Sequence, residues 1–189
     1  MKTKLILMLS IVVFVCSNSA FAKGFQPPSK GKAVVYFARV TSWGGSSSFE
    51  FFHQDKYIGV FKKVNYIRYE CDPGEQLFWA STENKEFITA NLKEGGSYII
   101  IVDVIMGAWK PRVGFNPITY DDVDIFERAK DLINKKDPVI TPDKKIEEMN
   151  VKLKPFIEEK LEMYNTTWKN EKDFKHISPE MAIPESAMK

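Results

Sequence analysis

The chain has very little cysteine and very little histidine. Among its 189 residues only Cys16 and Cys71 are cysteines, and only His53 and His176 are histidines. The patterns H-E-x-x-H, G-x-S-x-G and G-x-x-x-x-G-K, which mark zinc proteases, α/β-hydrolases and P-loop proteins, are also missing. The sequence therefore offers no familiar catalytic motif, and we expect neither a cofactor nor a bound metal.

The first 22 residues have the pattern of a secretory signal peptide. Lys2 and Lys4 are basic, residues 5–15 are apolar, and residues 20–22 (Ala-Phe-Ala) form a small-residue cleavage site. The apolar run of 11 residues is too short for a transmembrane helix, which needs about 20. The sequence predicts an exported protein, periplasmic or secreted, whose mature chain starts at Lys23 and has no transmembrane span.

A lipid anchor is the alternative to a freely exported chain. Cys16 lies where a lipoprotein signal carries its acylated cysteine, but the bulky residues 13–15 precede it, where processing requires a small residue. Cleavage before Lys23 removes Cys16 and leaves Cys71 as the only thiol. The mature chain would then form no intramolecular disulfide, even in an oxidising compartment.

Net charge is also lacking once the leader is removed. The chain has 27 basic and 25 acidic residues, and two of the basic ones, Lys2 and Lys4, lie in the leader. A neutral mature chain gives no reason to expect nucleic acid as a partner. Residues 23–119 carry a net charge of +3 and residues 120–189 a net charge of −3. Opposite charges favour docking of the second segment on the first.

Seven short apolar runs follow a leader, residues 23–32, that is rich in Pro, Gly and Ser and is expected to be flexible. The runs are rich in Val, Ile, Phe and Tyr, and their number and spacing predict a β-sandwich or barrel over residues 33–118. Residues 98–102 are apolar on both faces, so they should form a central strand covered by a further element. The predicted strands are residues 33–39, 48–54, 57–61, 66–71, 76–81, 86–92 and 98–105.

Beyond the sandwich the apolar spacing becomes helical, which predicts a helical extension of two helices over residues 119–177. Thr119 and Asp122 have the spacing of a capping box ahead of the first helix. Pro155 interrupts the second helix, and we expect a kink or a break near it. The last residues, 178–189, contain two prolines and few large apolar side chains, so we expect disorder there.

The loop at residues 41–47 is the best candidate for a binding surface, because Trp43 stands there beside two glycines and several hydroxyl residues. An indole can stack on a sugar ring or a peptide, and hydroxyls supply hydrogen bonds. Trp109, after the last predicted strand, is expected to join this surface. The alternative is that each indole only covers one end of the sandwich.

Cys71 and His53 are the one pair that suggests a nucleophile and a base, as in an exported hydrolase. Cys71 ends a predicted strand on the face of Ile67 and Tyr69, which predicts a buried and unreactive thiol instead. The acidic run at residues 121–124 opens a predicted helix, where capping explains it better than a calcium site. We therefore expect no catalytic residue and no enzymatic activity.

Four segments, read in order, carry a resemblance to a known family: G-K-A-V-V-Y-F-A-R (31–39), Y-I-G (57–59), D-P-G-E (72–75) and L-K-E-G-G-S-Y (92–98). On these segments the chain resembles, over about residues 31–116, bacterial exported domains known as domain of unknown function 2846. The resemblance implies a mainly β fold, an immunoglobulin-like or prealbumin-like antiparallel β-sandwich, often in a lipoprotein, with no assigned activity.

Arg39 is the matching polar position of this resemblance. It is expected either to contact a partner or to bond neighbouring carbonyls, or to pair with an acid such as Glu70. The sequence as a whole predicts an exported, non-enzymatic module of the cell envelope that binds a protein or glycan partner. The expected contact residues are Trp43, Trp109 and Arg39.

Overall fold

The structure, a computed structural model, describes residues 23–45, 47–107 and 111–189. The predicted signal peptide, Cys16 and Trp109 lie outside the described residues. In the described part of the chain the strands are β1 (Ala33–Arg39), β2 (Ser48–His53), β3 (Lys56–Lys62), β4 (Asn65–Cys71), β5 (Gly74–Ser81), β6 (Lys85–Leu92), β7 (Ser97–Ile105), β8 (Arg112–Ile118) and β9 (Lys175–Ile177). The helices are α1 (Val123–Lys135), α2 (Asp143–Met163), a π-helix (Tyr164–Trp168), α3 (Lys169–Glu171), a 3-10 helix (Pro179–Met181) and α4 (Glu185–Met188).

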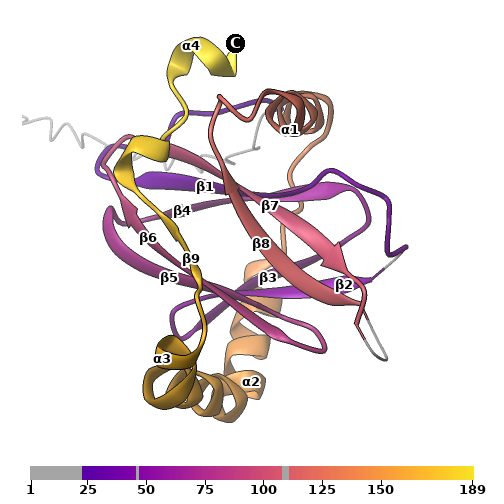
Figure 1. Ribbon diagram of the computed structural model, residues 1–189, viewed down its shortest axis with the longest axis vertical. Coiled ribbons are helices and arrows are strands. Elements are labelled where there is room, and N and C mark those ends of the chain that lie inside the picture. Colours follow the sequence, from indigo (N-terminus) through magenta and orange to yellow (C-terminus); the bar gives the residue numbers. More distant parts are fainter. Residues whose placement is uncertain (1–22, 46, 108–110) are drawn as a thin grey trace, which may run out of the picture.

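The strands form two sheets that pack face to face, and this confirms the predicted mainly β sandwich with a C-terminal helical extension (Figure 1). One sheet has the strand order β4-β1-β7-β8 and the other β3-β2-β5-β6-β9. Most neighbours are antiparallel, but β1 pairs with β7, and β6 with β9, in parallel. The sandwich is therefore not antiparallel throughout.

Seven of these strands coincide with the seven predicted runs to within two residues at either end. The sequence analysis missed β8 and β9. Gly114 and Pro117 interrupt the apolar pattern of β8, and Pro117 is tolerated because β8 is an edge strand, where a missing ladder donor costs little. β9 has only three residues, too few for an alternating pattern to be recognised.

The core between the sheets is built mainly from aromatic rings. Phe37 of β1 lies at its centre, with ring centroids 5.4 Å from Phe51, 5.6 Å from Phe78 and 5.9 Å from Phe115. These rings come from both sheets and all are buried. Aromatic pairs at such distances add to the free energy of apolar burial, so the core is stabilised without a disulfide.

Helix α1 covers the outer face of the four-stranded sheet (Figure 1). Its apolar stripe, which includes Phe126, Ala129 and Ile133, packs on Ile99 and Ile101 of β7. β7 is a central strand, as predicted, and α1 is the element that covers its second face. The doubly apolar run of β7 thus reflects burial on both sides.

Helix α2 and the following π-helix cover the outer face of the five-stranded sheet (Figure 1). Phe52 and Trp79 of the sheet stack at a centroid distance of 3.8 Å, and Phe87 stacks on Tyr164 at 4.6 Å. α2 continues through Pro155 without ending at Lys154. Helices α1 and α2 thus cover the two outer faces of the sandwich, and the fold has four layers: helix, sheet, sheet and helix.

The extension is held by apolar packing, and, among the described residues, its ion pairs lie within the extension itself. Lys135 pairs with Asp131, and two further pairs join residues three or four positions apart along α2. No ion pair between described residues joins the two segments. The side chains buried at the two outer faces hold the extension on the sandwich.

The prediction of disorder for residues 178–189 is wrong. The Ile183 N–H donates to the Ser97 carbonyl at 2.8 Å, and the Ile183 side chain is buried beside α1. Lys130 adds a bond from its Nζ to the Ala187 carbonyl at 2.8 Å. Few apolar side chains suffice here because the receiving surface on the sheet is already apolar.

The leader at residues 23–32 is also tied down rather than flexible. The Gly24 N–H donates to the Ile133 carbonyl, and the Gln26 N–H donates to the Tyr36 hydroxyl, both at 3.0 Å. Phe25 packs edge-on against the Tyr36 ring at 5.0 Å. Composition alone predicted a flexible segment, because the hydrogen-bond acceptors that fix it lie outside it, on α1 and β1.

Candidate functional site

The connections between strands meet at one end of the sandwich, which we call the loop end: residues 41–45 and 47, 81–84, 105–107 and 111. Asn84 ties two of these connections together, since its side chain donates to the Val113 carbonyl at 2.7 Å and accepts the Val113 N–H at 2.8 Å. Gly44 of the first loop lies against Val104, where a Cβ would come within 2.3 Å of Val104 Cγ1. The three connections therefore form one surface.

Arg39 holds the first of these loops from below. Its side chain is fully buried, with the guanidinium carbon 5.4 Å from the Phe49 ring centroid. The guanidinium donates to four backbone carbonyls of the loop: Nε to Thr41 at 3.2 Å, Nη1 to Ser47 at 3.1 Å, and Nη2 to Trp43 at 2.7 Å and Gly45 at 3.0 Å. Burial lowers the pKa of Arg39, but an arginine starts so high that it stays charged at neutral pH.

Of the three roles expected for Arg39, bonding to neighbouring carbonyls is the one that the structure shows. Glu70, the acid suggested as its partner, binds Arg68 at 2.7 Å and also accepts from the Ser29 hydroxyl. A fully buried guanidinium offers no surface to a partner. Arg39 is thus a positioning residue for the loop. Any contact with a partner must come from exposed side chains of that loop instead.

Trp43 is the exposed member of this loop, with 49% of its surface accessible. Two more apolar side chains at the loop end, Ile105 and Met106, are also exposed, Met106 by 75%. Trp109, which the sequence analysis placed on the same surface, lies outside the described residues. Exposed apolar side chains gathered at loop tips on a rigid sandwich are typical of a contact surface.

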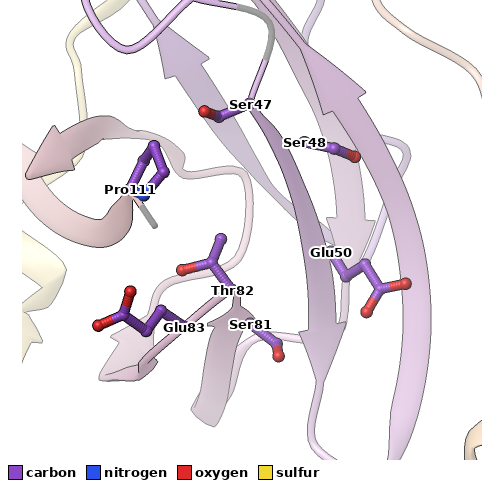
Figure 2. Close-up of a pocket in the computed structure, with 7 residues that line it drawn as sticks. All are labelled: Ser47, Ser48, Glu50, Ser81, Thr82, Glu83 and Pro111. Atoms are coloured by element: carbon purple, nitrogen blue, oxygen red, sulfur yellow. The ribbon is translucent and has the colours of Figure 1, made fainter. Parts of the chain in front are cut away.

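A hollow of about 670 Å³ lies at the loop end (Figure 2). Its lining residues are Ser47, Ser48, Glu50, Ser81, Thr82, Glu83 and Pro111. Ser47, Thr82 and Pro111 come from three different connections of the loop end (Figure 2). The volume lies within the range of small-molecule sites, and the lining supplies hydroxyls and two carboxyl groups as hydrogen-bonding partners.

Glu50 is the half-buried acid of this hollow. Burial raises the pKa of its carboxyl group, while Lys152 and Lys85 act in the opposite direction. The sequence analysis did not select Glu50 or the β5–β6 turn. The hydroxyl-rich composition of residues 41–47 correctly pointed to one side of the hollow. The other side, Ser81, Thr82 and Glu83, lies beside that loop only because β2 pairs with β5, which the sequence does not show.

Cys71 and His53 do not form a catalytic pair in the structure. Cys71 is buried in the core between the sheets, and burial raises the pKa of its thiol to about 12. His53 uses both ring nitrogens elsewhere, Nδ1 with the Tyr69 hydroxyl at 3.0 Å and Nε2 with Gln76 Oε1 at 2.6 Å. Burial also lowers the pKa of His53, so its ring is neutral at pH 7.

We expect Cys71 to resist thiol reagents as long as the protein is folded. With its pKa raised to about 12, the thiolate fraction at pH 8 is on the order of 100-fold or more below that of an unfolded cysteine. Ellman's reagent should therefore label the mature chain at least about 100-fold more slowly before denaturation than after it. Cys71→Ser is the blank for both measurements. Rapid labelling of the folded chain would contradict the buried thiol.

The acidic run before α1 forms a turn but not the predicted cap, because Asp122 is the N-cap residue and its side chain bonds no N–H of the helix. Asp122 Oδ2 accepts the Thr119 N–H at 2.8 Å and the Thr119 hydroxyl at 3.2 Å. The helix itself begins at Val123, so this box closes the turn just before it. Among the described residues no group of three or more His, Cys, Asp or Glu side chains could hold a metal ion.

Known proteins offer no guide to this surface. No family model matches the chain, and no curated protein matches it either. The resemblance to domain of unknown function 2846 stays a prediction. Within the described residues no helix is long and apolar enough to cross a membrane. The function must therefore be argued from the loop end itself.

Proposed function

We propose that the protein is an exported, non-enzymatic module of the bacterial cell envelope that binds a glycan through its loop end. The single observation that carries the proposal is the half-exposed Trp43 on a loop that the buried Arg39 holds and that contributes Ser47 to a hydroxyl-lined hollow. The leader with the pattern of a signal peptide supports the location outside the cytoplasm.

The loop end offers partners for both the apolar face and the hydroxyl groups of a sugar. An indole face packs on the C–H surface of a pyranose ring, and such rings are amphipathic in the same way as the tryptophan. Ser47, Thr82 and Glu83 lie where hydroxyls and a carboxyl group can exchange hydrogen bonds with sugar hydroxyls. The hollow is wide enough for about one or two sugar units, because its 670 Å³ is typical of small-ligand sites.

A protein partner is the second candidate, and the exposed Ile105 and Met106 favour it. Large apolar side chains next to an aromatic residue are enriched at the centres of protein interfaces. A lipid anchor at Cys16 is compatible with either partner, since it would fix the module to a membrane without altering the loop end. An exported hydrolase using Cys71 has least support, because that thiol is buried and its pKa is raised to about 12.

We expect Trp43→Ala to weaken glycan binding by at least tenfold, or about 1.4 kcal/mol. The measurement is co-sedimentation of the mature chain with purified peptidoglycan, and titration with lipopolysaccharide as a second envelope glycan. Tyr120→Ala is the matched control, because Tyr120 is an aromatic residue of similar exposure, 47%, outside the loop end.

Equal binding by wild type and Trp43→Ala, both with native circular dichroism, would remove Trp43 from the site. If neither glycan binds and cross-linking through position 43 captures a single envelope protein, the partner is a protein. In that case Met106→Ala should weaken the captured complex as well. Capture that is unchanged by both substitutions would overturn the loop end as a binding surface.

A further inference from the structure

A second hollow, which we call the basic hollow, lies where the helical extension meets the edge of the sandwich. It has a volume of about 390 Å³. Its walls come from the starts of β6 and β8, from α2, and from the segment that joins the π-helix to β9. The lining residues are Glu83, Asn84, Lys85, Glu86, Arg112, Lys160, Trp168, Lys172 and Phe174.

Cationic side chains dominate the basic hollow. Lys85, Arg112, Lys160 and Lys172 face two acids, Glu83 and Glu86, which leaves a net charge of +2 on its lining. Lys160 pairs with Glu159 at 2.6 Å. The other three cations form no ion pair with any carboxylate in the part of the chain that the structure describes. No described carboxylate in direct contact therefore neutralises these three charges, and Lys85 Nζ donates to the Thr82 carbonyl at 3.2 Å.

Two of the cations lie near the same aromatic ring. Lys85 Nζ lies 5.7 Å and Lys160 Nζ 5.6 Å from the centroid of the Phe156 ring. Burial lowers the pKa of Lys85, and the charge of Lys160 lowers it further. Glu159 and Glu50 act on the pKa of Lys85 in the opposite direction, so these acids offset part of the repulsion between the two ammonium groups.

Glu86 does not neutralise the basic hollow completely, because its carboxylate is engaged in the sandwich. It accepts the Phe115 N–H, and burial raises its pKa against the opposing effects of Lys175, Lys172 and Arg112. Two of these three cations, Arg112 and Lys172, also line the basic hollow, and both are exposed.

Aromatic side chains line the remaining wall. Lys172 Nζ lies 4.8 Å from the Trp168 ring centroid, and Phe174 lines the same hollow. The volume of 390 Å³ exceeds that of a bare inorganic anion and lies in the range of small organic ligands. The hollow therefore suits an anionic group joined to a larger body that can lie against the indole.

We propose that the basic hollow binds a phosphate group, as the free ion, as a soluble phosphate ester or as the headgroup of an anionic phospholipid. A phosphate monoester carries about −2 at neutral pH, which matches the net charge of the lining. Guanidinium and ammonium groups are the usual protein ligands of phosphate oxygens. This site shares Glu83 with the hollow of the glycan surface proposed above, but it involves none of the exposed apolar residues of the loop end.

The test is a titration of the mature chain with inorganic phosphate, followed through the indole N–H signals in a ¹H–¹⁵N spectrum. The chain has four tryptophans, so the Trp168 signal is assigned with Trp168→Phe. We expect that signal to shift in a saturable way while the Trp43 signal stays in place. In Arg112→Gln/Lys172→Gln the apparent affinity should fall at least tenfold. Lys30→Gln/Lys144→Gln, which removes two exposed charges elsewhere, should leave it unchanged.

A second arm distinguishes the sources of the phosphate. Co-sedimentation with phosphatidylglycerol vesicles but not with phosphatidylcholine vesicles, lost in Arg112→Gln/Lys172→Gln, indicates a lipid headgroup. Binding of inorganic phosphate without vesicle binding indicates a soluble phosphate or ester. Absence of both, or an equal loss in the two double variants, would overturn the proposal. The readout is the Trp168 signal, so the outcome of this test does not depend on whether the glycan test at Trp43 succeeds.

Discussion

Deletion of residues 141–189 is expected to abolish the native fold rather than release a stable sandwich. The deletion removes α2, the π-helix and β9, and so uncovers Phe52, Trp79 and Phe87, which are fully buried in the intact chain. Each of these large side chains contributes about 2 kcal/mol through burial. Their combined loss approaches the whole stability of a domain, which is about 5–15 kcal/mol.

The measurement compares the chain ending at residue 140 with the intact mature chain. We expect the shortened chain to lose its near-ultraviolet circular dichroism and cooperative unfolding, and to aggregate through the uncovered aromatic face. Deletion of residues 184–189 is the control, since it spares Ile183 and should keep the native spectrum. A monomeric, cooperatively unfolding chain ending at residue 140 would show that the extension is a separate addition.

Arg39→Ala is expected to destabilise the protein by about 3–4 kcal/mol and to loosen the Trp43 loop. The substitution removes a buried side chain and leaves four carbonyls of the loop without their donor. Urea unfolding measures the stability. Hydrogen exchange of residues 41–47, which should become much faster, measures the loop.

Two further variants separate charge from geometry at this position. Arg39→Lys keeps the positive charge, but one ammonium group cannot reach four carbonyls, so an intermediate loss of about 1–2 kcal/mol is expected. Arg112→Ala is the exposed counterpart and should change the stability by less than about 0.5 kcal/mol. If Arg39→Ala unfolds at the wild-type urea concentration, the guanidinium does not hold the loop.

Most of the sandwich could be predicted from the sequence because its strands carry clear local signals. The run Ala33–Arg39 is read correctly to the residue, since β-branched and aromatic residues bounded by Gly31 leave little choice. The prediction was wrong where local composition misleads. Residues 178–189 are poor in apolar side chains, yet Ile183 meets an apolar surface that the distant β7 and α1 supply.

The candidate site was only partly predictable, for a related reason. Trp43 could be selected because an indole between glycines and hydroxyl residues is a local signal. The role of Arg39 was left open between surface and interior, and only tertiary structure decides its burial. The basic hollow could not be foreseen, because its cations lie far apart in the sequence and meet only when α2 packs on the sheet.

The path of the last fifty residues has a consequence for the timing of folding. After covering the five-stranded sheet, the chain crosses along β9 and ends on the opposite sheet, where Ile183 bonds to Ser97 (Figure 1). Neither outer face is complete until nearly the whole chain has been synthesised. Contacts between residues so distant in sequence form late. We therefore expect the two outer faces to be completed only at the end of translation, a delay that the proposed export would require.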